Sequence, residues 1–273
     1  MEVHHRVEGP ADAPAVVLLH HFHGSVATWR HLLTDLGADH HVAAFDRPGF
    51  GLSARPPRSH WNGANPYTRA SAVAIALELV DLLGAEQAVL VGASAGGTVA
   101  LEAYARAPDR VRALVLLSPA ITGDVGPPAA LRPLLRARPA RRVGPALVRT
   151  IRRSRTIDAA RVGRAWHDAT RVDADDVAAY TRPLAAPGWD RAFWEVVTAE
   201  PPPDLRRLLP RVAVPTLLLA GASDRVVPPA WSRRTAAAIP GAHLEILPGC
   251  GHTPHEERPD LVTEVIRRFL AQR

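Results

Sequence analysis

The segment GASAG, residues 92–96, places Ser94 between an apolar run and a helical pattern. On a tight turn from strand to helix a serine hydroxyl is exposed for attack, and small neighbours let the two backbones pass closely. The positive end of the following helix dipole suits a developing oxyanion. We therefore predict that Ser94 is a nucleophile.

A serine hydroxyl is a poor nucleophile near neutral pH, so it needs a base and a group that orients the base. Asp224 follows the apolar run TLLLAG, and His252 follows the run HLEILP. These two residues are the predicted acid and base. Asp124 could instead supply the acid, His255 the base, and Cys250 a Cys–His pair, although a small buried residue is the simpler interpretation of Cys250.

Short apolar runs with few polar interruptions are typical of strands buried on both faces of a parallel sheet. They alternate with helical patterns at 28–36, 71–83, 97–107 and 259–272, so we expect a parallel α/β sheet with helices on both faces. The predicted strands occupy residues 15–20, 41–46, 88–93, 113–118, 216–221 and 243–248.

This alternation breaks between about residues 122 and 211. The segment is rich in Arg, Ala and Pro and reads as helices separated by turn residues. We interpret residues 122–211 as a helical cap lying over a core made of residues 1–121 and 212–273. Residues 132–171 contain 12 Arg against Asp158 and Asp168, a local charge of +10.

Five segments together resemble the α/β-hydrolase superfamily over nearly the whole chain: LLHHFHGS, FDRPGFGLS, VGASAGG, GASDRVVP and GCGHTPHEERP. The resemblance implies a mostly parallel sheet with a helical cap inserted after the sixth core strand. It also implies that Ser94 is the nucleophile, His252 the general base and acid, and Asp224 the residue that orients His252. The amides of Ala95 and Phe22 would form the oxyanion hole.

The segment LLHHFHGS departs from the family pattern, because His21 stands where a glycine is usual after the family histidine, His20. Three interpretations remain open: His21 is tolerated and the oxyanion hole is intact, His21 or His23 enters the pocket as a donor or acid–base group, or the oxyanion hole is impaired. The three clustered histidines could also suggest a metal site, but no carboxylate near them in the sequence completes a ligand set, so none is expected.

Aromatic residues concentrate late in the cap, where they could line a substrate pocket or pack the cap against the core. An aromatic-lined cleft beneath an arginine-rich cap would suit a small-molecule substrate with an anionic or carrier-linked end. The candidate pocket residues are His21, His23, Trp166, Trp189, Phe193 and Trp194, with Tyr180 nearby.

Composition excludes several classes of function. The chain has 273 residues, a net charge of +6 and a single cysteine, so no intrachain disulfide is expected. No nucleic-acid-binding motif is recognisable, and few aromatic residues are interleaved with the arginines. No apolar run is long enough to span a membrane. Gly49-x-Gly51 is followed by no helix signal, which argues against a dinucleotide site. We expect a cytoplasmic protein without cofactor or metal.

The sequence thus predicts a cofactor-free serine hydrolase that cleaves an ester, thioester or similar carbonyl substrate through an acyl-enzyme. Two alternatives stay open. One is a biosynthetic lyase or eliminase, an acyltransferase or a carbon–carbon bond hydrolase on the same fold, which the unusual His21 favours. The other is a non-catalytic binding protein, since a fold does not determine function.

Overall fold

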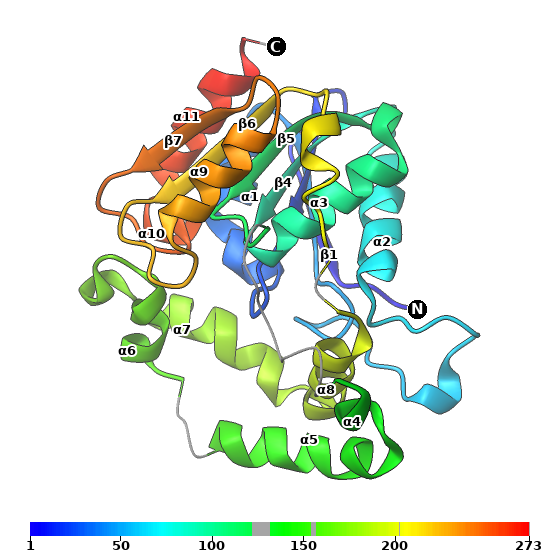
Figure 1. The fold of residues 1–273 in the computed structure, drawn as a ribbon. Coiled ribbons are helices and arrows are strands. Elements are labelled where there is room, and N and C mark those ends of the chain that lie inside the picture. Colours follow the sequence, from blue (N-terminus) through cyan, green and yellow to red (C-terminus); the bar gives the residue numbers. More distant parts are fainter. Residues whose placement is uncertain (122–131, 154–156, 202, 273) are drawn as a thin grey trace.

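The computed structural model describes residues 1–121, 132–153, 157–201 and 203–272. Within these ranges seven strands form one sheet in the order β1-β3-β2-β4-β5-β6-β7 (Figure 1). All neighbouring pairs are parallel except β1 and β3. The strands are β1 His5–Glu8, β2 Ala15–Leu19, β3 His41–Phe45, β4 Ala88–Ala93, β5 Val111–Leu117, β6 Thr216–Gly221 and β7 His243–Leu247.

The expected α/β architecture is confirmed, because helices cover both faces of the sheet and each predicted strand is present. Side chains of β2 alternate between two apolar cores, with Val16 and Leu18 on one face and Val17 and Leu19 on the other. The helices α1 (Arg30–Leu36) and α11 (Pro259–Leu270) cover the first face, and α2 (Arg69–Leu82), α3 (Ala95–Arg106) and α9 (Pro229–Ala238) cover the second.

A helical insert lies between β5 and β6, at one end of the sheet (Figure 1). It follows the predicted strand at 113–118, as expected, and that strand is the fifth of the described sheet. The predicted start of the insert, residue 122, lies outside the described residues. Its helices are α4 Arg132–Arg136, α5 Arg138–Arg153, α6 Ala159–Val162, α7 Ala174–Thr181 and α8 Trp189–Ala199.

Buried carboxylates of the insert pair with arginines of the core. Asp176 on α7 accepts a hydrogen bond from Arg30. Glu195 on α8 accepts two from Arg58, each 2.8 Å long. The two-pronged pair between Arg58 and Glu195 fixes orientation as well as position, so it helps to set how the insert sits over the core.

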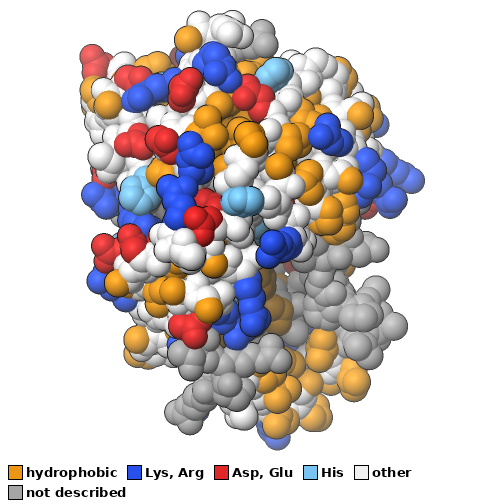
Figure 2. All heavy atoms as spheres, turned by 90° about the vertical axis from the view of Figure 1, so that its left-hand side faces the viewer, with side chains coloured by type: hydrophobic (Ala, Val, Ile, Leu, Met, Phe, Trp, Pro, Cys, Tyr) orange, Lys and Arg blue, Asp and Glu red, His pale blue; other side chains and the backbone are white. Residues whose placement is uncertain are grey.

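The distribution of charged side chains and the apolar character of the helices limit which partners the surface can bind. Arginines are interspersed with Asp and Glu on the face that Figure 2 shows, so basic charge forms no continuous field there. Among the described helices, none combines the length and apolar character that crossing a membrane would require.

Candidate active site

The turn at Ser94 has the strained geometry that the GASAG segment predicts. Ser94 lies between the end of β4 at Ala93 and the start of α3 at Ala95, with φ 49° and ψ −112°, a conformation that residues other than glycine rarely adopt. Its small neighbours are required by the packing. A Cβ on Gly96 would lie 1.9 Å from the carbonyl oxygen of Leu19, and a Cβ on Gly92 would lie 2.6 Å from the Gly96 backbone.

Asp224 and His252 lie side by side, as the sequence predicts. The Asp224 Oδ2 and His252 Nδ1 atoms are 2.9 Å apart, and the two residues are 6% and 8% exposed. Asp224 Oδ1 accepts 2.8 Å hydrogen bonds from the amides of Val226 and Val227. A carboxylate held in this way fixes the proton of His252 on Nδ1 and leaves Nε2 free to act as a base.

Ser94 is 8% exposed, and within the described residues no hydrogen bond joins its hydroxyl to His252. The alternatives to this set receive little support. Asp124 lies outside the described residues. His255 has no hydrogen-bond partner in the described structure for either ring nitrogen. Cys250 is buried, and burial followed by the charge of Glu257 raises the pKa of its thiol to about 11, so it stays protonated at neutral pH.

Two backbone amides, those of Ala95 and Phe22, are the predicted donors of an oxyanion hole. Ala95 is the first residue of α3, a position whose N–H cannot bond within the helix. Neither Ala95 nor Phe22 donates a backbone hydrogen bond to another described residue. Both predicted donors are therefore available to a ligand.

His20 positions the loop that carries Phe22. Its Nε2 accepts a 3.0 Å hydrogen bond from the Arg47 amide, so its proton is on Nδ1, which donates to the carbonyl of His21 at 2.7 Å. The Arg47 guanidinium donates to the same carbonyl at 3.1 Å. Burial, and then the charge of Arg47, lower the pKa of His20 well below its ordinary value of 6.5. His20 is therefore neutral in the folded protein.

Acid should destabilise the fold through its buried neutral histidines. His20 has a lowered pKa, and burial lowers the pKa of His255 to about 3. Both bind protons near pH 6.5 only when unfolded, so their contribution is complete above that pH and is lost as the pH falls toward 3. We expect the free energy of unfolding to drop about 1.4 kcal/mol per pH unit for each group.

Urea unfolding of metal-free protein between pH 7 and pH 4 measures this slope. The variant His255→Phe keeps the ring that packs on Trp29 and should show a shallower slope. The control His31→Gln changes an exposed histidine and should leave the slope unchanged. Equal slopes in all three proteins would contradict the prediction.

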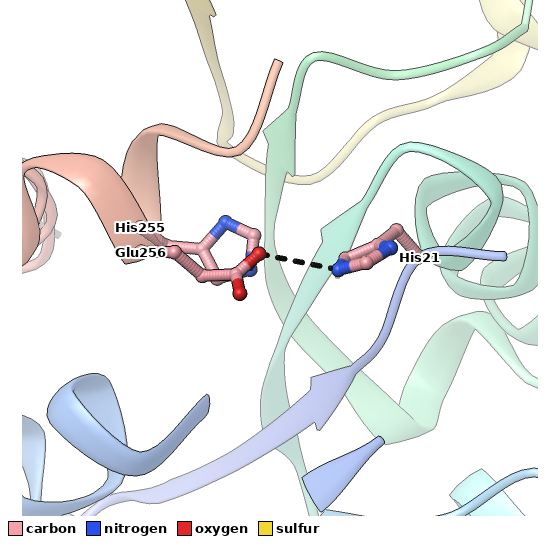
Figure 3. Close-up of side chains that lie close together, drawn as sticks. All are labelled: His21, His255 and Glu256. Carbon is pink, nitrogen blue, oxygen red and sulfur yellow. Dashed lines mark ion pairs between the residues drawn. The ribbon is translucent and has the colours of Figure 1, made fainter. Parts of the chain in front are cut away.

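The structure turns the His21 side chain toward α10 (Pro254–Glu257). Its Nε2 lies 3.3 Å from Glu256 Oε1 (Figure 3). The same nitrogen lies 3.3 Å from the Tyr180 hydroxyl. Position 21 has no positive φ, so the backbone accepts a histidine without strain. The sequence around His20, His21 and His23 contains no carboxylate that could complete a ligand set, and the fold brings Glu256 to His21 from a distant segment. This contact favours a tolerated His21 over one that enters the pocket.

The contacts among His21, Glu256 and Tyr180 shift the pKa values of Glu256 and Tyr180. Burial acts to raise the pKa of Glu256, but the hydrogen bond and charge of His21, then His255 and the Tyr180 hydroxyl, hold it below its ordinary value. Tyr180 donates to Glu256 Oε1 at 2.8 Å. Burial, and then the charge of Glu256, raise the pKa of Tyr180 well above 10.0. Glu256 is therefore ionised and Tyr180 protonated near neutral pH.

The predicted pocket residues divide into two groups. Phe193 of α8 contacts the oxyanion loop, with its ring 5.6 Å from the rings of both Phe22 and His23. Trp194 packs within the insert, because a Cβ on Gly144 of α5 would lie 2.3 Å from its ring.

Among the described residues, no ring contact joins Trp166 or Trp189 to the loop that carries Phe22. Trp166 is buried with its backbone against the His252 loop, since a Cβ on Gly251 would lie 2.7 Å from it. Trp189 begins α8, is half-buried and makes no described ring contact with the oxyanion loop. The structure thus brings Phe193, but not Trp189 or Trp194, to the predicted oxyanion hole.

Glu257 is a site residue that the sequence reasoning missed. Its buried carboxylate accepts hydrogen bonds from the amide of Gly251 at 2.8 Å and from those of His167 and Asp168 at 2.9 Å. The amide of His252 also donates to Ala165 at 2.5 Å. The histidine loop is thereby fixed to the insert. The only sequence signal for Glu257 was the acidic pair that follows HTPH, and the partners of Glu257 in the insert are distant in sequence.

Comparison with known proteins shows the family of this chain. Residues 14–259 match the family described as the alpha/beta hydrolase fold. The chain belongs to the α/β-hydrolase family. Within this family, the 2-hydroxymuconate semialdehyde hydrolase of Pseudomonas putida is 31% identical to this α/β hydrolase, over 85% of this chain and 77% of its own.

Two esterases are also similar to this α/β hydrolase. The pimeloyl-(acyl-carrier protein) methyl ester esterase of Xanthomonas oryzae is 31% identical over 94% of this chain and 95% of its own. The thermophilic esterase of Thermogutta terrifontis has a structure that superposes with a TM-score of 0.77 and 26% identity, covering 99% of this chain and 93% of that one. Distant relatives of this α/β hydrolase are therefore both esterases and carbon–carbon bond hydrolases.

Proposed function

We propose that this protein is a serine hydrolase that cleaves an ester or thioester through the triad Ser94, His252 and Asp224. The observation that carries the proposal is the pairing of the strained elbow at Ser94 with the Asp224–His252 hydrogen bond. A nucleophile on such a turn and a base oriented by a carboxylate are the parts that acyl transfer requires.

In the proposed reaction Ser94 Oγ attacks the carbonyl carbon while His252 Nε2 takes its proton. The amides of Ala95 and Phe22 hold the oxyanion. His252 then gives the proton to the leaving group, which departs and leaves an acyl-serine. Water, deprotonated by His252, attacks this ester, and the released serine recovers its proton. Asp224 keeps the imidazole in the required tautomer and stabilises its charged form.

The substrate class we propose is a small to medium carbonyl compound with an anionic or carrier-linked end. The insert supports this, because its arginines outnumber its acidic residues and Arg138 and Arg142 are exposed on α5. A basic surface attracts anionic substrates over distances of about 8–10 Å at moderate salt. One relative carries an acyl-carrier protein in its name, which agrees with such an end.

The test is intact-protein mass after treatment with a fluorophosphonate, on wild type and on Ser94→Ala. We expect one adduct on wild type and none on the variant. A panel of esters and thioesters, each paired with an analogue lacking its carboxylate, then defines the substrate. Folded wild type that reacts with neither this probe nor a smaller one would overturn the proposal.

A second candidate is carbon–carbon bond hydrolysis, and the identity to the Pseudomonas putida hydrolase favours it. The same panel should therefore include 2-hydroxymuconate semialdehyde. Product analysis separates the two candidates, since one cleaves a carbon–oxygen or carbon–sulfur bond and the other a carbon–carbon bond.

Removing the Phe193 ring should weaken substrate binding more than it slows the chemical step. Phe193 packs on Phe22 without belonging to the proposed triad. The loss of one aromatic contact, about 1.4 kcal/mol, corresponds to a tenfold rise in KM. We expect Phe193→Ala to raise KM about tenfold and to change kcat less than about threefold.

Steady-state kinetics on a substrate from the panel check this expectation. Trp194→Phe is the control, because Trp194 packs on α5 and should leave KM unchanged. A fall in kcat with unchanged KM for Phe193→Ala would instead show that the ring serves the reaction step.

A further inference from the structure

The His21 cluster (His21, His255 and Glu256) contains more ligand atoms than a hydrogen-bonded pair needs. One nitrogen of each histidine and one oxygen of Glu256 all lie within 4.8 Å of one another. The separations from Glu256 Oε1 are 3.3 Å to His21 Nε2 and 3.8 Å to His255 Nε2. Figure 3 shows a Glu256 oxygen directed toward the His21 ring, with the His255 ring close to the carboxylate.

His255 supplies the second, independent observation. It is 1% exposed, and both of its ring nitrogens lack a hydrogen-bond partner among the described residues. A buried polar group without a partner costs about 1–3 kcal/mol. Packing on Trp29, at a centroid distance of 4.3 Å, occupies the face of the ring but satisfies neither nitrogen. A ligand that accepts a nitrogen lone pair would satisfy one of them.

We propose that His21, His255 and Glu256 form a binding site for a divalent transition-metal ion, with Zn²⁺ the best fit. Imidazole and carboxylate donors suit zinc. Ligand atoms about 2.0–2.1 Å from a tetrahedral zinc ion lie about 3.4 Å from one another. The separations from Glu256 Oε1, 3.3 and 3.8 Å, need little adjustment, and the two histidine nitrogens, which lie within 4.8 Å of each other, would move closer as the ion binds.

Tyr180 supports the Glu256 carboxylate from outside the proposed ligand set. Tyr180 also lies 3.1 Å from Glu256 Oε2, so it keeps a hydrogen bond to the carboxylate when Oε1 binds the ion. Such a partner orients a ligating carboxylate. His21 follows β2, Glu256 is on α10 and Tyr180 is on α7 of the insert. The ion would therefore join two parts of the core and, through Tyr180, the insert.

The experiment measures metal content and does not depend on the proposed hydrolase activity. Untagged protein is produced with added zinc, dialysed against metal-free buffer and analysed by elemental mass spectrometry. We expect one zinc ion per chain in wild type, and loss of that ion in His255→Gln and Glu256→Gln. Replacement by Co²⁺ should give the visible absorption of a tetrahedral site, which both variants lack.

The matched control is His243→Gln, which removes an exposed histidine that lies 3.2 Å from Glu245. It should keep the ion. A wild type without zinc, or a His255→Gln variant that retains it, would overturn the proposal.

If the ligand variants fail to fold, Tyr180→Phe tests the site with all three ligands in place. Loss of an outer partner should weaken zinc affinity about 10–100-fold. Unchanged affinity in this variant, measured by competition with a chelator, would also count against the site.

Discussion

Asp224→Asn is expected to lower kcat about 10⁴-fold while leaving the fold intact. The asparagine carbonyl can still accept the amides of Val226 and Val227, which now bond to Asp224 Oδ1. Its NH₂ group, however, would face His252 Nδ1, whose N–H now donates a hydrogen bond to the carboxylate. His252 would then carry its proton on Nε2 and could not take one from Ser94.

Steady-state kinetics and circular dichroism on the purified variant check this prediction. Asp204→Asn is the matched control, because Asp204 is exposed and pairs with Arg206 on the surface. Its kcat should equal that of wild type. Retention of more than about a tenth of wild-type kcat in Asp224→Asn would show that Asp224 does not orient the base.

Restoring the family's glycine at position 21 is expected to destabilise the protein by about 3 kcal/mol. His21→Gly removes the ring that pairs with Glu256 and leaves a buried carboxylate with Tyr180 as its remaining close partner. A buried polar group that loses a hydrogen-bond partner costs about 1–3 kcal/mol, and more when the group is charged, as the Glu256 carboxylate is.

Urea unfolding of metal-free protein measures this effect. Glu256→Gln in the His21→Gly background should recover most of the lost stability, since it removes the uncompensated charge. That recovery separates the charge effect from the cavity left by the ring. If the double variant were no more stable than His21→Gly, the pair with Glu256 would not be the reason for the histidine.

The fold could be predicted because its signals are local. Each parallel strand is an apolar run with few polar interruptions, and the glycines around Ser94 mark the turn that the structure shows. β1 was missed because it is a four-residue antiparallel edge strand with no buried side chain. The start of α3 was placed at Gly97 and not at Ala95 because Gly96 indicates a turn, whereas its close approach to Leu19 of β2 requires a glycine inside the helix.

The candidate site was predictable only in part, for a related reason. The residues of the proposed triad follow strand ends, which topology brings to one edge of the sheet. The contacts of His21 with Glu256 and Tyr180 join segments that are distant along the chain, and no local pattern encodes them. Glu257 was missed likewise, since its partners are backbone amides of the insert and of the histidine loop.

The two outer strands of the sheet, β1 and β7, have a consequence for self-association. Exposed strand edges are templates for pairing with another chain, and charged side chains and short length protect against this. β1 has four residues and exposes His5 and Arg6, and β7 carries Glu245, which pairs with Arg268 at 2.8 Å. A second sheet added at either edge would have to cover these charges. Continuous sheets across two copies of this chain are therefore disfavoured, which protects the protein against aggregation through its strands.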